Sequence, residues 1–445
     1  MTERTVDRTP QPQAAIVIHP IRSGAAASRS PEQRLEEAVG LAEALDLKVV
    51  DRQLAAVRTV TPATLFGKGK SQELASLCAA LEVDVAVIDD SLTPVQQRNL
   101  ERAWQVKVID RTGLILEIFA RRARTREGRL QVELARLAYE RSRLVRTWTH
   151  LERQRGGFGF LGGPGETQIE ADRRLLADRI AKLKRDLTQV RRTRGLGRAA
   201  RKRVPFPSLA LVGYTNAGKS TLFNRLAGAK VDARNLLFAT LDPTVRAVQL
   251  PSGRPAILSD TVGFISDLPH ELVEAFRATL EEVQEADIIL HVRDISAEQS
   301  QAQAEDVEAV LAQIGADRES GRAVIEVWNK VDLLPEAERA ELLERGRPPA
   351  GSSAQPVVAV SAATGEGCDH LLAFLAELVD QGAPIEAQLG ADEGDAMAWL
   401  YRHGRVMGRT DDDTGGVHLS VRLDAQALGQ FERLFPHTLL REAAE

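Results

Sequence analysis

Residues 208–226 read SLALVGYTNAGKSTLFNRL, and this stretch decides the fold of the domain that contains it. A strand-like apolar run from Ser208 to Val212 leads directly into the pattern Gly-x4-Gly-Lys-Ser, and a helix-like run follows at Leu222. Glycines let backbone N–H groups converge on phosphate oxygens, and the helix N-terminus favours negative charge. The stretch therefore predicts a phosphate-binding loop in an α/β domain, with a tight strand-to-helix turn that binds no ligand as the alternative.

Two side chains of this loop have expected roles of their own. Lys219 should reach the β- and γ-phosphates as a point charge, and the Ser220 hydroxyl should hold Mg²⁺. The remaining positions contribute backbone N–H groups and the tight turn itself. The residues predicted to bind nucleotide here are Gly213, Tyr214, Thr215, Asn216, Ala217, Gly218, Lys219 and Ser220.

Three later segments indicate that the bound base is guanine. After a strand-like run, Asp260 can hold Mg²⁺ through water and the Gly263 N–H can sense a γ-phosphate. Asp332 can accept hydrogen bonds from N1–H and N2–H2 of guanine, which adenine lacks, and small residues after the next strand can offer N–H groups to O6. Each segment alone could be a turn, a polar strand end or a packing element, but their order predicts a GTP-binding domain. The residues are Asp260, Thr261, Val262, Gly263, Asn329, Lys330, Val331, Asp332, Ser361, Ala362 and Ala363.

The loop between these motifs holds the residue expected to respond to the γ-phosphate. A Thr in residues 237–244 can coordinate Mg²⁺ only when the γ-phosphate is present, which makes the loop an order–disorder switch. Thr240 is the preferred residue, and Thr244 is its rival because both lie in one loop. Ser220 and Thr240 are therefore the predicted Mg²⁺ ligands. The residues of this loop predicted to contact GTP are Phe238, Ala239, Thr240, Leu241 and Asp242.

The 445 residues suffice for about three domains, and strands alternate with helices in two separate regions. We expect an α/β protein with an N-terminal parallel-sheet α/β domain, an antiparallel helical hairpin, a P-loop GTPase domain and a small C-terminal α+β domain. A basic linker is expected over 194–207, an acidic linker over 382–395 and a strand over 396–403. The expected boundaries are 1–12 for a disordered lead, 13–122 for the N-terminal domain, 123–200 for the basic hairpin with a glycine-rich tip, 205–381 for the GTPase domain and 395–445 for the C-terminal domain.

Apolar residues recur at spacings of three and four over 130–151 and again over 169–190. Two such stripes predict helices that pack on each other, and the glycines of 156–165 separate them because each glycine costs a helix about 1 kcal/mol. Residues 173–203 hold thirteen Lys or Arg against two acids, and 121–155 hold eleven Arg against four, whereas the whole chain has a net charge of −5. This distribution favours an element that faces a polyanion, with a solvated helical face as the alternative.

Composition excludes several classes of protein. Hydrophobic residues at 43% and charged residues at 27% are typical of globular domains and not of disordered, collagenous or fibrous chains. The two cysteines, Cys78 and Cys368, cannot build a disulfide framework. No apolar run approaches the roughly 20 residues of a membrane helix, and the first residues lack the apolar core of a signal peptide. We therefore expect a cytoplasmic monomer with no membrane-spanning segment.

Taken together, these motifs resemble the HflX family of GTPases over nearly the whole chain. Besides the nucleotide motifs, the resemblance includes GKGK at 67–70, DRT at 110–112 and GPGETQ at 163–168, the last of which related GTPases of the Obg and Era types lack. Gly162 stands where the family usually has an Arg, which puts the tip contacts in question. The resemblance implies binding of GTP and GDP, binding to the large ribosomal subunit with the hairpin tip near the peptidyl-transferase centre, splitting of stalled ribosomes and ribosome-stimulated GTP hydrolysis.

One position departs from a Ras-like catalytic site. Phe264 stands where such a GTPase has the Gln that orients water, so no catalytic residue is assigned and the free protein should hydrolyse GTP slowly. A ribosomal contact or a monovalent cation could complete the site. Asn216 stands where cation-dependent relatives place a K⁺ ligand, with a loop-stabilising residue as the alternative. The 67–70 segment is interpreted as a basic turn, with a phosphate or RNA contact as the alternative. The sequence contains no second complete phosphate-binding loop, so no ATP site is predicted.

Three functions are compatible with these features. The leading prediction is a GTPase switch that acts on ribosomes. An RNA-binding, RNA-modification or RNA-remodelling factor in ribosome assembly, regulated by GTP, is the second, but the sequence shows no separate catalytic or cofactor motif for it. A chaperone-like RNA-binding module with a merely structural nucleotide domain is the third. Stimulation of GTP turnover by large subunits, absent with free RNA, separates the first function from the other two.

Overall fold

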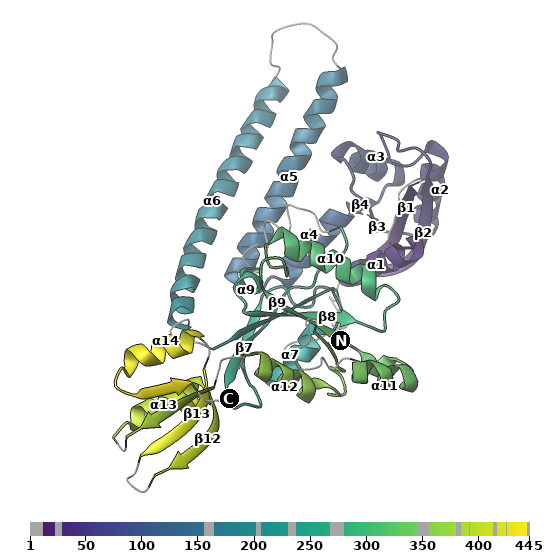
Figure 1. Cartoon of the computed structure of the whole chain (residues 1–445). Coiled ribbons are helices and arrows are strands. Elements are labelled where there is room, and N and C mark those ends of the chain that lie inside the picture. The colour runs from purple at the N-terminus through teal and green to yellow at the C-terminus, as the bar shows by residue number, and fades with distance from the viewer. Residues whose placement is uncertain are drawn as a thin grey trace, which may run out of the picture. The chain divides into compact units, whose positions relative to one another are not determined.

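The computed structural model describes residues 12–22, 29–154, 164–201, 206–229, 237–267, 280–345, 356–379, 384–390, 392–412, 416–423 and 425–442. Most of the expected lead at 1–12 and of the expected tip at 156–165 therefore lies outside the described residues. The chain divides into two compact units (Figure 1). The N-terminal unit comprises Met1–Val190 and two later segments, Arg234–Asp242 and Ser266–Arg277, and the second unit comprises the rest.

The N-terminal unit is built on a parallel four-stranded sheet in the order β2-β1-β3-β4. Residues 15–20 of β1 are all buried, as expected of a strand that is covered on both faces of the sheet. Complete capping boxes on Ser30 and Thr93, each followed by a proline, start two of the helices. The elements are β1 (Ala14–Arg22), α1 (Pro31–Glu43), β2 (Lys48–Val57), α2 (Lys68–Ala80), β3 (Val85–Ile88), α3 (Pro94–Trp104), β4 (Lys107–Asp110) and α4 (Arg111–Arg122).

One expectation for this unit was wrong, and one helix was not predicted. The 67–70 segment is not a separate basic turn, because Gly67 precedes α2 and the next three residues form its first helical turn. No helix was predicted at α4, whose continuous apolar run has no clear period. The side chain of Asp110 starts this helix by accepting a hydrogen bond from the backbone N–H of Gly113 at 2.9 Å.

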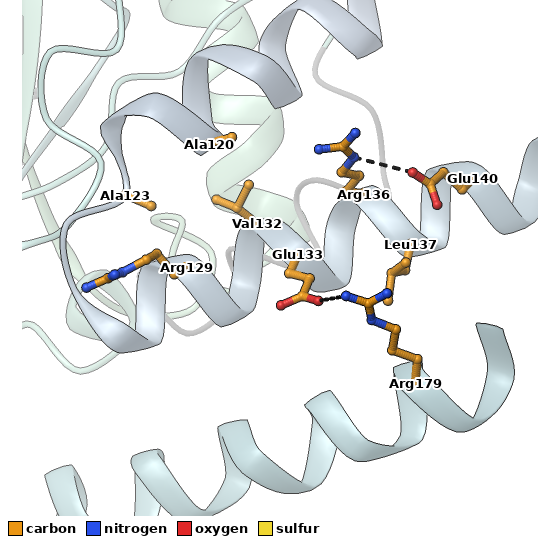
Figure 2. A pocket seen from close by; sticks show the side chains of 9 residues that line it. All are labelled: Ala120, Ala123, Arg129, Val132, Glu133, Arg136, Leu137, Glu140 and Arg179. Carbon is orange, nitrogen blue, oxygen red and sulfur yellow. Dashed lines mark hydrogen bonds and ion pairs between the residues drawn. The ribbon is translucent and has the colours of Figure 1, made fainter. Parts of the chain in front are cut away.

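A long antiparallel pair of helices, α5 (Arg126–Gln154) and α6 (Pro164–Arg201), confirms the predicted hairpin (Figure 1). Its seam buries Leu137 against Ile180 and Leu183, at the predicted spacing. Beside α4 lies an open pocket of about 460 Å³, lined mainly by α5, where an ion pair of 2.8 Å joins Arg179 of α6 to Glu133 of α5 (Figure 2). The linker expected over 194–207 was wrong in its first half, because α6 continues to Arg201 through two isolated glycines.

The second unit contains a six-stranded sheet in the order β10-β9-β8-β5-β7-β6, parallel except for the edge strand β6. Its core is formed by the apolar strands and the helices packed on them. The elements are β5 (Ser208–Gly213), α7 (Lys219–Ala227), β6 (Thr244–Gln249), β7 (Pro255–Asp260), α9 (Glu281–Gln284), β8 (Ile288–Asp294), α10 (Ser300–Gln313), β9 (Ala323–Asn329), the 3-10 turn η1 (Val331–Leu333), α11 (Glu336–Arg345), β10 (Val357–Ala359) and α12 (Cys368–Val379).

The C-terminal part of this unit is an antiparallel sheet in the order β12-β13-β11-β14. Both of its helices share one core with the sheet. The predicted strand at 396–403 was wrong, since these residues lie in a helix, and the predicted linker at 382–395 contains the central strand β11. The elements are β11 (Pro384–Leu389), α13 (Gly394–His403), β12 (Arg405–Asp411), β13 (Val417–Arg422), α14 (Ala425–Leu434) and β14 (Leu439–Glu442). In the described part of the chain, no helix is long and apolar enough to cross a membrane.

Candidate nucleotide-binding site

The loop between β5 and α7 has the backbone of a phosphate-binding loop. Gly213 has φ 152° and Gly218 has φ 94°, values that residues other than glycine rarely adopt. A Cβ at Gly213 would overlap the carbonyl oxygen of Val292 on β8, and one at Gly218 would overlap the side-chain nitrogen of Asn329. Glycine is therefore required at both positions, and the backbone between them is free to turn around an anion.

The two polar side chains at the start of α7, those of Lys219 and Ser220, bind different partners: backbone carbonyl oxygens and a carboxylate. The ammonium group of Lys219 is buried and donates hydrogen bonds to the carbonyl oxygens of Gly213 at 3.0 Å and Tyr214 at 2.8 Å. Burial lowers the pKa of Lys219 to about 8, although the negative charge of Asp260 opposes this shift. The Ser220 hydroxyl donates to Asp260 Oδ2 at 2.7 Å. A hydroxyl and a carboxylate at this separation are oxygen donors of the kind that Mg²⁺ prefers.

The segment after β7 is fastened to the phosphate-binding loop. The N–H of Phe264 donates to the carbonyl oxygen of Gly213 at 3.1 Å, and the N–H of Thr215 donates to that of Phe264 at 2.7 Å. A Cβ at Gly263 would lie 2.8 Å from Thr215 Cγ2 and 3.1 Å from Lys219 Nζ, so only glycine fits beside this loop. The Phe264 side chain is 2% exposed. It therefore offers neither a polar atom nor access to water.

The residues predicted to hold the base meet at the ends of β9 and β10. The side chain of Asn329 joins two loops, donating to the carbonyl oxygen of Ala217 at 2.8 Å and accepting from the N–H of Ala362 at 2.9 Å. The Ser361 hydroxyl donates to Asp332 Oδ1 at 2.6 Å, which orients that carboxylate. No sequence motif indicated Arg225, whose guanidinium donates to the carbonyl oxygen of Ala362 at 3.2 Å and to that of the next residue.

The remaining predicted residues, Phe238–Asp242, belong to the N-terminal unit, whereas all the others belong to the second unit. Phe238 and Leu241 are each 2% exposed, and Thr240 is 9% exposed. The Asp242 carboxylate accepts hydrogen bonds from the backbone N–H groups of Arg124 and Thr125, both at 2.9 Å. This loop is therefore packed on the N-terminal unit, an arrangement that no motif in the sequence indicated.

The segment that follows Phe264 also packs on the N-terminal unit. The guanidinium of Arg111 donates to the carbonyl oxygen of Ser266 at 3.1 Å and to its hydroxyl at 3.0 Å, and that hydroxyl donates to Glu37 at 2.7 Å. Arg111 also pairs with Asp89, whose other oxygen lies 2.8 Å from Nδ1 of His19. Burial alone would raise the pKa of Asp89, but the hydrogen bond from His19 and the charge of Arg111 outweigh it and lower the pKa.

These side chains stand at the carboxyl ends of β1, β3 and β4, the edge of the sheet where open α/β folds hold their ligands. Here the residues at that edge hold Ser266 of the same chain. Sequence reasoning missed this contact because its partners lie 155 residues apart along the chain. No spacing rule connects an arginine at a helix start to a serine so distant.

Four family models match the chain in succession. They are described as GTP-binding GTPase N-terminal over residues 32–120, GTP-binding GTPase Middle Region over 122–201, 50S ribosome-binding GTPase over 208–330 and HflX C-terminal domain over 350–441. Together these matches cover both units, so the similarity is not limited to the nucleotide motifs.

Curated relatives agree with these matches. GTPase HflX of Magnetococcus marinus is 52% identical over 402 residues, which is 90% of each chain, and GTPase HflX of Escherichia coli is 45% identical over 81% of this chain and 83% of its own. The structure described as "crystal structure of SsGBP and GDP complex" is 25% identical with a TM-score of 0.47, covering 83% of this chain and 99% of that one. With half of its residues identical to a curated relative over nine-tenths of its length, the chain belongs to the HflX family of GTPases and hydrolyses GTP.

Proposed function

We propose that the protein is a ribosome-associated GTPase whose second unit binds GTP or GDP through the residues assembled around Lys219, Asp260 and Asp332. The observation that supports the nucleotide site best is the bridge made by Asn329, which joins the phosphate-binding loop to the loop of Ala362. In this arrangement Lys219 binds the β- and γ-phosphates, the Gly263 N–H contacts the γ-phosphate, and Asp332 accepts the guanine donors.

Mg²⁺ fits this site because the hydroxyl of Ser220 and the carboxylate of Asp260 are already adjacent. Ser220 would hold the ion directly, Asp260 would act through water, and Thr240 would join it when GTP is bound. Bound Mg²⁺ supplies positive charge against the phosphate oxygens during hydrolysis. Thr240→Ala should therefore weaken binding of a GTP analogue while leaving the affinity for GDP unchanged.

The group that assists the attacking water must come from elsewhere than Phe264, since that side chain is buried and apolar. We propose two sources, a group of the ribosome and a K⁺ ion held at Asn216. Asn216 is exposed, and its backbone has φ 62°, which lies in the left-handed region. Equal turnover in potassium and sodium buffers, with and without ribosomes, would eliminate the K⁺ proposal.

The basic hairpin supports the ribosomal part of the proposal. Arg174, Lys182, Lys184 and Arg185 of α6 are exposed, which suits a surface that meets closely spaced phosphates. The family model matching residues 208–330 carries the description 50S ribosome-binding GTPase, and we extend that partner to this chain. We further propose that GTP-bound protein docks on the large subunit, splits stalled ribosomes and leaves after hydrolysis.

The direct test is phosphate release from GTP in the presence of isolated large subunits or of free ribosomal RNA. We expect stimulation by subunits, little by RNA, and loss of stimulation in Lys182→Glu/Arg185→Glu. A matched control, Lys48→Glu/Lys107→Glu, makes the same change of charge at exposed positions of the N-terminal sheet and should behave like the wild type. Equal stimulation by free RNA would favour the second candidate, an RNA-remodelling factor. Equal effects of the two variants would refute a role for the hairpin.

A further inference from the structure

The inference concerns the switch segment, defined here as Leu237–Asp242, and the start of helix α5. Within the N-terminal unit, the ring of Phe238 meets that of Phe119 on α4 edge to face, with 4.7 Å between the ring centroids. Leu241 is buried as well, and Leu237 approaches Gly40 of α1 so closely that a Cβ there would lie 3.2 Å from its Cδ1. Apolar anchors therefore hold the segment on both sides of Thr240.

A polar anchor follows two residues after Thr240. Oδ2 of Asp242 accepts the backbone N–H groups of Arg124 and Thr125, and Oδ1 accepts the Thr125 hydroxyl. The same hydroxyl oxygen accepts the N–H of Gly128 at 2.9 Å, in the first turn of α5. The first N–H groups of a helix have no partner within the helix, so Asp242 and Thr125 together complete the start of α5.

The turn before α5 is held from its other side as well. Arg129 donates to the carbonyl oxygen of Arg124 at 3.0 Å and to that of Thr125 at 3.4 Å. These contacts fix the direction of the N–H groups that reach Asp242. The carboxylate therefore meets a preformed set of donors at the positive end of a helix dipole, where a negative charge is favoured.

We propose that Thr125 is a positioning residue for GTP: through Asp242 it fixes the switch segment that carries Thr240, the residue proposed to engage the γ-phosphate and its Mg²⁺. The inference rests on the proposed role of Thr240. Since coupling between two sites is reciprocal, GTP must in turn stabilise the first turn of α5. The hairpin helix then reports the state of the nucleotide through a single carboxylate.

Gly128 supplies a variant that separates positioning from folding. A Cβ at this position would overlap Oδ1 of Asp242 and lie 3.2 Å from Oγ1 of Thr125. The obstructing atom is the end of a side chain, so the Asp242 carboxylate can move away. Alanine also favours a helix more than glycine does. Gly128→Ala should therefore displace the carboxylate while the helix itself is retained.

The experiment measures the affinity of the full chain for GDP and for a non-hydrolysable GTP analogue by calorimetry. Thr125→Val and Gly128→Ala should each weaken binding of the analogue about five-fold and leave GDP binding unchanged, as expected for the loss of one helix-capping interaction. Thr125→Ser, which keeps the hydroxyl, should bind both nucleotides like the wild type. Amide hydrogen exchange at the first turn of α5 should be slower with the analogue than with GDP in the wild type only.

The possible results separate this inference from the proposal on which it rests. Equal weakening of both nucleotides, or none in either variant, would overturn the positioning role of Thr125. The same holds if exchange at α5 is identical in both nucleotide states. If Thr240→Ala binds the analogue as tightly as the wild type does, the proposed role of Thr240 itself fails, whatever the Thr125 variants show.

Discussion

Single side chains are proposed to determine which base and which charge the nucleotide site accepts. Asp332 is oriented by Ser361 and faces a loop whose N–H groups are fixed by Asn329. The ammonium group of Lys219 is buried and donates hydrogen bonds to two carbonyl oxygens of its own loop. Phosphate must take over these hydrogen bonds, so binding exchanges weak neutral acceptors for strong charged ones.

The Asp332→Asn substitution tests the base contact. Each hydrogen bond to a charged group contributes about 1.5–3 kcal/mol, so GDP affinity should fall about ten-fold or more. Xanthosine diphosphate has a carbonyl where guanine has its amino group, and it should bind the variant better than the wild type. Asp369→Asn, the same change at an exposed position of α12, should alter neither affinity. Calorimetric titration decides, and an unchanged preference for GDP would refute the role of Asp332.

The lowered pKa of Lys219 predicts a proton linkage. Free Lys219 is partly neutral near pH 8, and phosphate stabilises the ammonium, so nucleotide binding raises its pKa and takes up a proton above about pH 8. Affinity for GDP should therefore fall as pH rises from 7 to 9. Calorimetry at pH 8.5 in two buffers of different ionisation enthalpy measures the uptake. At pH 7 Lys219 is charged in both states and its contribution should vanish; uptake that is equal at both pH values would contradict the assignment.

Among the elements, the sheet edge of the N-terminal unit is the least expected feature. Arg111 stands between the carboxylates of Asp89 and Glu37 and holds Ser266 with its remaining hydrogen bonds. Its positive charge compensates two negative charges that have little access to water. The guanidinium therefore stabilises the unit and fixes the segment after Phe264 at the same time.

Arg111→Met should destabilise the protein by about 3–5 kcal/mol, because two carboxylates would lose the buried charge that compensates them. Arg409→Met provides the control, since it removes the ion pair with Asp411, in which both side chains are largely exposed, and it should cost far less stability. Urea denaturation measures both changes. If both substitutions lower the free energy of unfolding by similar amounts, the network at the sheet edge stabilises the protein no more than an exposed ion pair does.

The sequence predicted some elements better than others for identifiable reasons. The phosphate-binding loop and the hairpin were predictable because a glycine pattern and a repeated leucine spacing are local signals. A strand is predicted at 396–403, where the structure has the helix Gly394–His403. The sequence there, AMAWLYRH, mixes apolar and polar residues in a run too short to show a period. The contacts of Asp242 and Ser266 were unpredictable, since they join residues more than 100 positions apart.

For the whole molecule, we propose that nucleotide bound in the second unit controls RNA binding by the basic hairpin, most of which lies in the N-terminal unit. Within the N-terminal unit, the loop that carries Thr240 ends at Asp242, which completes the start of α5. Binding to ribosomal RNA should depend steeply on salt, because each contact with a phosphate releases counterions. The same dependence should be weaker in Lys182→Glu/Arg185→Glu, which removes two of the cations.

We propose that GTP controls whether the hairpin binds ribosomal RNA within the large ribosomal subunit. The most direct measurement is the affinity of the protein for isolated large subunits at one fixed salt concentration, with either GDP or a non-hydrolysable GTP analogue bound. The account predicts binding about ten-fold tighter with the analogue, a coupling of ordinary size for an allosteric protein. Equal affinity in the two nucleotide states would contradict it.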